Sequence, residues 1–184
     1  MLTVTGERFA EQAQSSKYDG IKYDQCDCQA FVEAVLRDCG VRTQAGAVWN
    51  WKGSNDMWRN ALAWKGTIKE CRERFGYIPA GAWAFMWAND GAEIKRGYYD
   101  GLGNASHVGI FCRPNELKSV RDSTKGTGRD GVGYRKLDDF THIGLPKVLV
   151  FGDSNPSPDT QTDNIDKTKA LEALQILTEF VKGC

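Results

Sequence analysis

Residues 23–32, Tyr-Asp-Gln-Cys-Asp-Cys-Gln-Ala-Phe-Val, lead from a polar loop into an amphipathic helix. The apolar residues that follow the i, i+3, i+4, i+7 spacing of one helix face are Cys28, Phe31, Val32, Val35, Leu36 and Cys39. Asp27 stands at the expected N-cap, and Gly40 stands at the expected end. Cys28 is therefore predicted in the first turn on the inward face, where unpaired backbone N–H groups favour a thiolate.

Helices are expected to come first along the chain and strands afterwards. Further helices are predicted over residues 6–15, over 54–62 with Ser54 as the cap, and after Thr67, whose spacing to Glu70 is that of a capping box. Strands are predicted at 82–87, 107–112, 119–122 and 146–151, with a Gly-rich turn at 126–133. This order predicts an α+β domain whose N-terminal helices pack on a mainly antiparallel sheet.

The domain is expected to occupy residues 1–152 of the 184. Residues 153–165 are polar and interrupted by prolines, which is typical of a linker. Residues 166–184 are predicted to form an amphipathic helix whose apolar face contains Leu171, Leu174, Leu177, Phe180 and Val181. Because so short a helix is not stable alone, we expect it to dock on its own domain or to form a homo-oligomer with a second copy.

Charge and hydropathy exclude two classes of partner. Lysine plus arginine and aspartate plus glutamate each number 24, and no dense basic run is present, so nucleic acid is not an expected partner. No apolar run approaches the roughly 20 residues that span a bilayer, so no membrane span is expected. Residues 1–14 lack the features of a secretory signal, so we expect synthesis in the cytoplasm, with any later export by another route.

Two histidines are candidates to act as a base beside Cys28. His107 opens the apolar run His-Val-Gly-Ile-Phe of residues 107–111, and the start of a strand is a rigid mount for a base. His142 lacks such a strand context and ranks second. Cys26, Cys28 and His107 could supply three zinc ligands, but no second cysteine pair completes a structural site, so we expect no metal and no cofactor.

These motifs carry a resemblance to a known family. The helix start at 27–32 and the strand start at 107–111 resemble the two motifs of the NlpC family of papain-like cysteine peptidases, and the similarity extends from about residue 20 to 151. The resemblance implies a papain-like fold in which Cys28 is the nucleophile and His107 is the general base. It also implies that Asp122 is the third, polar residue, where the family more often has His, Asn or Gln. Tyr23 matches a family tyrosine whose hydroxyl could stabilise an oxyanion.

The resemblance further implies a substrate. A member of this family would be expected to hydrolyse an amide bond in a peptidoglycan stem peptide, next to γ-D-glutamyl, and a phage or prophage lysin released or delivered to the cell wall would fit. An amidase or acyltransferase on the same scaffold would use the same residues. The alternative to an enzyme is a non-catalytic module for wall binding or assembly.

Tryptophans are unusually frequent between the expected nucleophile helix and Pro79. Trp51 stands among polar residues, and Trp58 lies on the next predicted helix. Aromatic rings in polar surroundings can line a groove for an extended ligand, although packing against the sheet is the commoner role. Trp51 and Trp58, together with Tyr23 and Asp27, are therefore the candidates for substrate binding.

Overall fold

The computed structural model describes residues 4–112, 119–126 and 128–152. The chain divides after Gly152 into two units, and the described residues belong to the first unit, Met1–Gly152. The expected linker at 153–165 and helix at 166–184 lie outside the described residues. The first unit is an α+β domain with a six-stranded antiparallel sheet.

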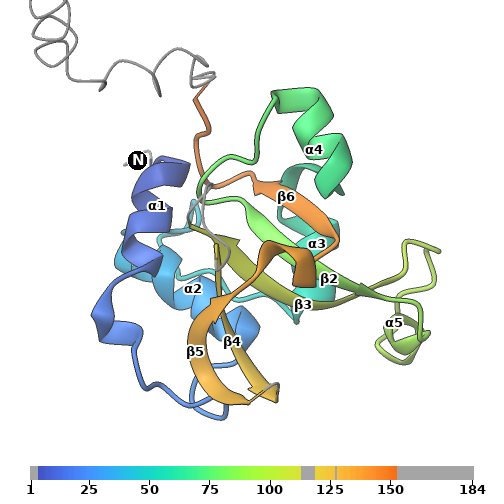
Figure 1. Cartoon of the computed structure of the whole chain (residues 1–184), viewed down its shortest axis with the longest axis horizontal. Coiled ribbons are helices and arrows are strands. Elements are labelled where there is room, and N and C mark those ends of the chain that lie inside the picture. Colours follow the sequence, from blue (N-terminus) through green and yellow to red (C-terminus); the bar gives the residue numbers. More distant parts are fainter. Residues whose placement is uncertain (1–3, 113–118, 127, 153–184) are drawn as a thin grey trace, which may run out of the picture. The chain divides into compact units, whose positions relative to one another are not determined.

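The sheet has the strand order β1-β6-β2-β3-β4-β5 (Figure 1). All neighbouring strands are antiparallel, and the late strand β6 is inserted between β1 and β2. Strands β3 and β4 are therefore neighbours in the sheet. The strands are β1 (Leu62–Thr67), β2 (Trp83–Ala88), β3 (Asn104–Phe111), β4 (Val120–Gly126), β5 (Arg129–Arg135) and β6 (His142–Pro146).

Most of the helices precede β2. Thr5 caps the first α-helix by accepting a hydrogen bond from the Arg8 backbone, and the capping box between Thr67 and Glu70 is present as predicted. Among the described residues, no helix is long and apolar enough to cross a bilayer. The helices are α1 (Gly6–Ala13), η1 (Ser16–Tyr18), α2 (Cys28–Asp38), α3 (Ser54–Asn60), α4 (Ile68–Phe75), α5 (Ala92–Lys95) and η2 (Leu137–Asp139).

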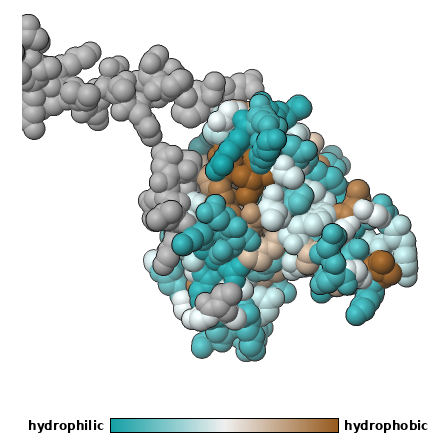
Figure 2. All heavy atoms as spheres, turned by 45° about the vertical axis from the view of Figure 1, so that its right-hand side comes forward, coloured by the Kyte–Doolittle hydropathy of each residue, from teal (hydrophilic) through white to brown (hydrophobic). Residues whose placement is uncertain are grey.

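Apolar side chains form two clusters, one toward α1 and α2 and one toward α4. Alternation along β3 divides them, because Val108 and Ile110 belong to the first cluster while Phe111 belongs to the second. Phe31 and Val32 of α2 are fully buried in the first cluster. Polar side chains cover much of the outer surface in Figure 2, between smaller apolar patches. Helix α2 is thus anchored on the sheet.

Three of the predicted elements are corrected. Ser54 is not a cap, because Gly53 occupies the N-cap position of α3 and the Ser54 hydroxyl donates to the Ala105 carbonyl at 2.6 Å. Leu62 belongs to β1, because pairing with β6 overrides the helical spacing at the end of the predicted segment. The strand expected at 146–151 lies instead at His142–Pro146.

The Gly-rich segment 126–133 is mostly strand rather than turn. Strand β5 begins at Arg129, and Gly131 has φ +114°. A Cβ on Gly131 would collide with the Ile21 carbonyl, while the neighbouring Val132 N–H donates to that same carbonyl at 3.1 Å. This glycine therefore permits close approach of two backbones rather than chain reversal.

A buried polar network fixes the start of β3. The Asn55 side chain accepts from the Ala105 N–H at 3.0 Å and donates to Asn104 Oδ1 at 2.7 Å. Arg59 donates to Asn55 at 2.9 Å and holds Asp100 with two further bonds of 2.7 and 2.8 Å. Because each polar group in this network has a partner, the network rigidifies the connection that leads into β3.

Replacing Asn55 with alanine should therefore destabilise the domain strongly. The Ala105 N–H and the Asn104 side chain would lose partners in a buried setting, and we expect a cost of about 2–3 kcal/mol in the free energy of unfolding. Asn60→Ala on the same helix is the matched control, because Asn60 is exposed and should cost below about 0.5 kcal/mol. Urea denaturation measures both, and equal losses would contradict a bracing role for Asn55.

Candidate active site

The first turn of α2 carries Cys28. Asp27 is the N-cap as predicted, and its carboxylate accepts a hydrogen bond from the Ala30 N–H at 2.8 Å. Cys28 is the first helical residue, with 8% of its surface exposed. The backbone N–H groups of this first turn lack intrahelical acceptors. The Ala30 N–H is taken by Asp27, and the Cys28 and Gln29 N–H groups of this turn can stabilise negative charge near the thiol.

A β-bulge precedes His107 on β3. Met86 pairs with His107 while Trp87 pairs with Ala105, so Ser106 is an additional residue on β3. Such a bulge redirects the side chains beside it, and bulges are frequent next to active sites. The His107 side chain is largely buried, with Phe140 lying against its ring at a centroid distance of 6.2 Å.

Asp122 reaches His107 from the neighbouring strand β4. His107 Nε2 and Asp122 Oδ2 are 2.6 Å apart, and the Asp122 side chain has no exposed surface. Gly109 makes room for this contact, because a Cβ there would lie 2.6 Å from Val120 Cγ1 and 3.0 Å from Asp122 Cβ. A side chain at Gly109 would therefore clash with β4.

The Cys28 thiol lies beside His107 and interacts with its ring. Because Nε2 of His107 is taken by Asp122, Nδ1 is the ring nitrogen left for the thiol. Burial lowers the pKa of His107, but the hydrogen bonds and negative charges of Asp122 and Cys28 outweigh burial and raise the pKa to about 9. The site therefore favours a protonated His107 ring beside the Asp122 carboxylate.

Tyr23 completes the surroundings of the thiol. Its side chain lies close to Cys28, and its backbone N–H donates to Asp130 Oδ1 of β5 at 3.3 Å. Burial and the charges of Cys28 and Asp27 raise the pKa of Tyr23 above its ordinary value. The phenol therefore stays protonated and can donate a hydrogen bond beside the sulfur.

Trp51 and Trp58 lie in the apolar core, contrary to the expectation that polar neighbours would keep Trp51 out of it. They are 8% and 5% exposed. Trp51 stacks on Trp49 at 5.1 Å and meets Trp83 edge-on, while Trp58 packs edge-on against Phe85. The polar sequence around Trp51 gave a wrong prediction for its ring. The backbone of Trp51 makes the polar contacts, with Gln29 and Glu33, while its ring packs in the core.

His142 has no cysteine partner in the described structure. It opens β6, contrary to the prediction that it lacks a strand context, and it packs between Trp58 and Trp87 with Thr141 Oγ1 at 2.8 Å from Nδ1. Burial lowers its pKa. Within the described ranges, no cluster of three metal-ligating side chains occurs.

Two arginines of β5 were not anticipated from the sequence. Arg129 donates to Asp122 Oδ1, and Arg135 Nε lies 3.3 Å from Asp122 Oδ2. The signal that could have revealed them is the period-two spacing Arg-Asp-Gly-Val-Gly-Tyr-Arg over residues 129–135, which places both arginines on one face of a strand. The two glycines led instead to the prediction of a turn.

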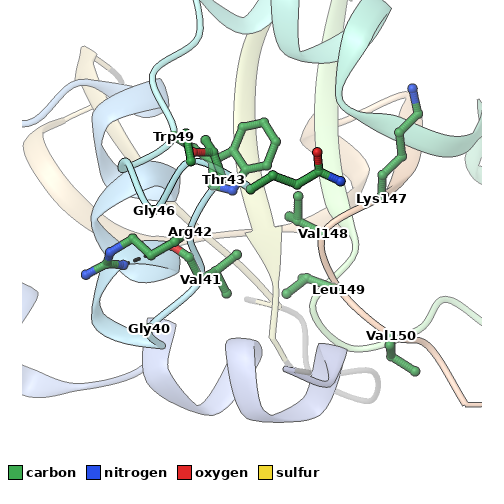
Figure 3. A pocket seen from close by; sticks show the side chains of 12 residues that line it. Gly40, Val41, Arg42, Thr43, Gly46, Trp49, Lys147, Val148, Leu149 and Val150 are labelled. Atoms are coloured by element: carbon green, nitrogen blue, oxygen red, sulfur yellow. Dashed lines mark hydrogen bonds between the residues drawn. The ribbon is translucent and has the colours of Figure 1, made fainter. Parts of the chain in front are cut away.

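A groove lies at the other end of α2. Figure 3 shows it between the loop that follows α2 and residues 147–150, and its volume is about 1120 Å³. An 11-residue helix is about 16 Å long, so this groove is separate from the surroundings of Cys28. Its lining includes Val41, Trp49, Val148 and Leu149.

The described site brings together the Cys28 thiol, the His107 ring and the Asp122 carboxylate, with His107 between the other two. A scan against protein-family models and searches of curated proteins and of solved structures found no match for this chain. The chemistry that the site can perform is therefore inferred from its own geometry. Nucleophilic attack by Cys28 with proton transfer by His107 is that chemistry.

Iodoacetamide labelling should distinguish Cys28 from Cys26. Both residues are 8% exposed, but burial raises the pKa of Cys26 to about 11, whereas Cys28 has His107 as its partner. We expect Cys28 to be alkylated faster than Cys26 near neutral pH, because the raised pKa of Cys26 keeps its thiol protonated. Peptide mass spectrometry locates the label. Equal rates of labelling at the two cysteines would contradict this difference in their surroundings.

Proposed function

We propose that this protein is a papain-like cysteine peptidase that cuts an amide bond in peptidoglycan stem peptides. The observation that carries the proposal is the placement of His107 between Cys28 and Asp122, with His107 Nε2 2.6 Å from Asp122 Oδ2 and the thiol at a helix start. The resemblance of the two motifs to the NlpC family supports the same assignment. In this proposal Cys28 is the nucleophile, His107 the acid and base, and Asp122 the residue that orients the imidazole.

The reaction would proceed in two halves. Cys28 Sγ attacks the carbonyl carbon, and the C–N bond breaks as the His107 imidazolium gives its proton to the leaving amine, which leaves a thioester. His107, now neutral, takes a proton from water, and the resulting hydroxide breaks the thioester and releases a carboxylic acid. The Cys28 thiolate and the His107 imidazolium are restored at the end of the cycle.

The negative charge on the carbonyl oxygen needs donors in the first half. The Cys28 backbone N–H lies at the start of α2 without an intrahelical acceptor. The Tyr23 hydroxyl stays protonated and lies close to the Cys28 side chain, so it is within reach of a carbonyl attacked by that sulfur. These two groups are the proposed oxyanion donors.

The substrate class follows from the family resemblance. The proposed bond is the amide next to γ-D-glutamyl in the stem peptide, reached when the protein is released from the cell or delivered to the wall. The same residues would serve an acyltransferase, in which an amine replaces water in the second half, or an amidase, in which the leaving group is ammonia.

Digestion of purified peptidoglycan tests this function. We expect the wild-type protein to release fragments with new amine termini, and Cys28→Ala to lose at least about a thousandfold in rate because the sulfur that forms the thioester is removed. Cys26→Ala is the matched control, because the Cys26 thiol is as buried as that of Cys28 but does not interact with His107 in the described structure. This variant should retain activity. Mass spectrometry of the released fragments is the measurement.

The product pattern separates the alternatives. Ammonia release, or products that carry a new amide link, would change the assigned reaction while keeping Cys28 as the nucleophile. Binding to the wall without fragments from either the wild-type protein or the variants would contradict a peptidase and favour a recognition module.

A further inference from the structure

We propose that Arg129 and Arg135 are positioning residues that hold the Asp122 carboxylate against the His107 ring. The inference rests on the proposed function in one respect, that His107 is the acid and base. It adds a third layer to the site, behind the thiol and the histidine. The two arginines lie at opposite ends of β5, and both reach Asp122 on the adjacent β4.

The register of the sheet places both arginines on the face of Asp122. Asp122 pairs directly with Gly133, while Arg135 pairs with Val120 and Arg129 with Gly126. Side chains two residues apart along a strand share a face, and directly paired residues share it too. The arginines therefore approach the carboxylate from its two sides along one surface.

The two oxygens of the Asp122 carboxylate have different partners. Oδ1 accepts from Arg129 Nη2, while Oδ2 lies 2.6 Å from His107 Nε2 and 3.3 Å from Arg135 Nε. The Asp122 side chain is fully buried, and those of Arg129 and Arg135 are 23% and 11% exposed. A buried carboxylate is costly unless it is paired and hydrogen-bonded, so this anion depends on its cations.

Gly133 provides the path for Arg129. A Cβ on Gly133 would collide with Arg129 Nη1 and lie 2.8 Å from Arg129 Cδ. The guanidinium group thus crosses the backbone at the residue directly opposite Asp122. No unusual φ is involved at Gly133, so the space for this side chain is what the glycine provides.

The charged and titratable side chains that face His107 come from three elements. They are Cys28 from α2, Asp122 from β4, and Arg135 with Arg129 from β5. Strand β2 and the segment before β6 contribute the uncharged Met86 and Phe140.

Two effects of removing the arginines have opposite signs. Loss of two cations near the imidazolium would remove electrostatic repulsion, and this effect alone would raise the pKa of His107. Loss of the clamp would leave a buried anion that takes up a proton or turns away, and the imidazolium would lose its partner, which lowers the pKa of His107. The direction of the change therefore distinguishes a holding role from a general field.

Ring ¹⁵N NMR titration of His107 tests the proposal, and with two histidines in the chain the spectrum can be assigned with a His142→Asn variant. In the Arg129→Gln/Arg135→Gln double variant we expect the pKa of His107 to fall by about 1 or more, toward the ordinary 6.5. Gly133→Ala keeps both charges and should shift the pKa in the same direction by displacing Arg129. If the double variant does not fold, Gly133→Ala and Arg129→Gln alone give the result.

Arg121→Gln is the matched control. Arg121 is also a buried arginine of this sheet, at 2% exposure, but it pairs with Asp19 and not with Asp122. Its loss should leave the pKa of His107 unchanged even where it lowers stability. An unchanged or raised pKa in the clamp variants would overturn the proposal. Because this readout needs no substrate, failure to digest peptidoglycan would count against the proposed function and not against the clamp.

Discussion

The structure of this site depends on one buried hydrogen bond, between His107 Nε2 and Asp122 Oδ2. It fixes the imidazole so that Nδ1 is directed to Cys28, and it supplies the negative charge that keeps the ring protonated against the effect of burial. A carboxylate with no exposed surface imposes further requirements. Gly109 must lack a side chain, and cations must lie behind Asp122.

The rest of the scaffold keeps the members of this series in place. Asp27 caps α2 so that Cys28 occupies its first turn, and a bulge at Ser106 directs His107. The network around Asn55 and Arg59 fixes the chain as it enters β3. Rigid elements rather than loops therefore carry the thiol, the base and the carboxylate, which is what a preorganised site requires.

Local patterns predicted the parts of the site that local physics determines. The apolar spacing after Cys28 and the position of Asp27 indicated a capped helix, and the run from His107 indicated a strand. The features that the sequence did not predict depend on contacts between residues far apart in the chain. Strand β1 was not predicted, and its first residue Leu62 was assigned to a helix, because its partner β6 is some eighty residues away in the chain. The arginines behind Asp122 were missed because glycines that allow close approach resemble glycines of a turn. Trp51 was misplaced because its polar contacts come from its backbone.

The pH dependence of kcat/KM on peptidoglycan fragments, measured for the wild-type protein and Asp122→Asn, tests the central claim most directly. Asparagine keeps the shape and a hydrogen-bonding group but removes the charge. The account predicts that wild-type activity declines on the alkaline side near pH 9, where His107 loses its proton, and that in Asp122→Asn this decline moves toward about pH 6.5. Coincident alkaline limbs for the two proteins would contradict it.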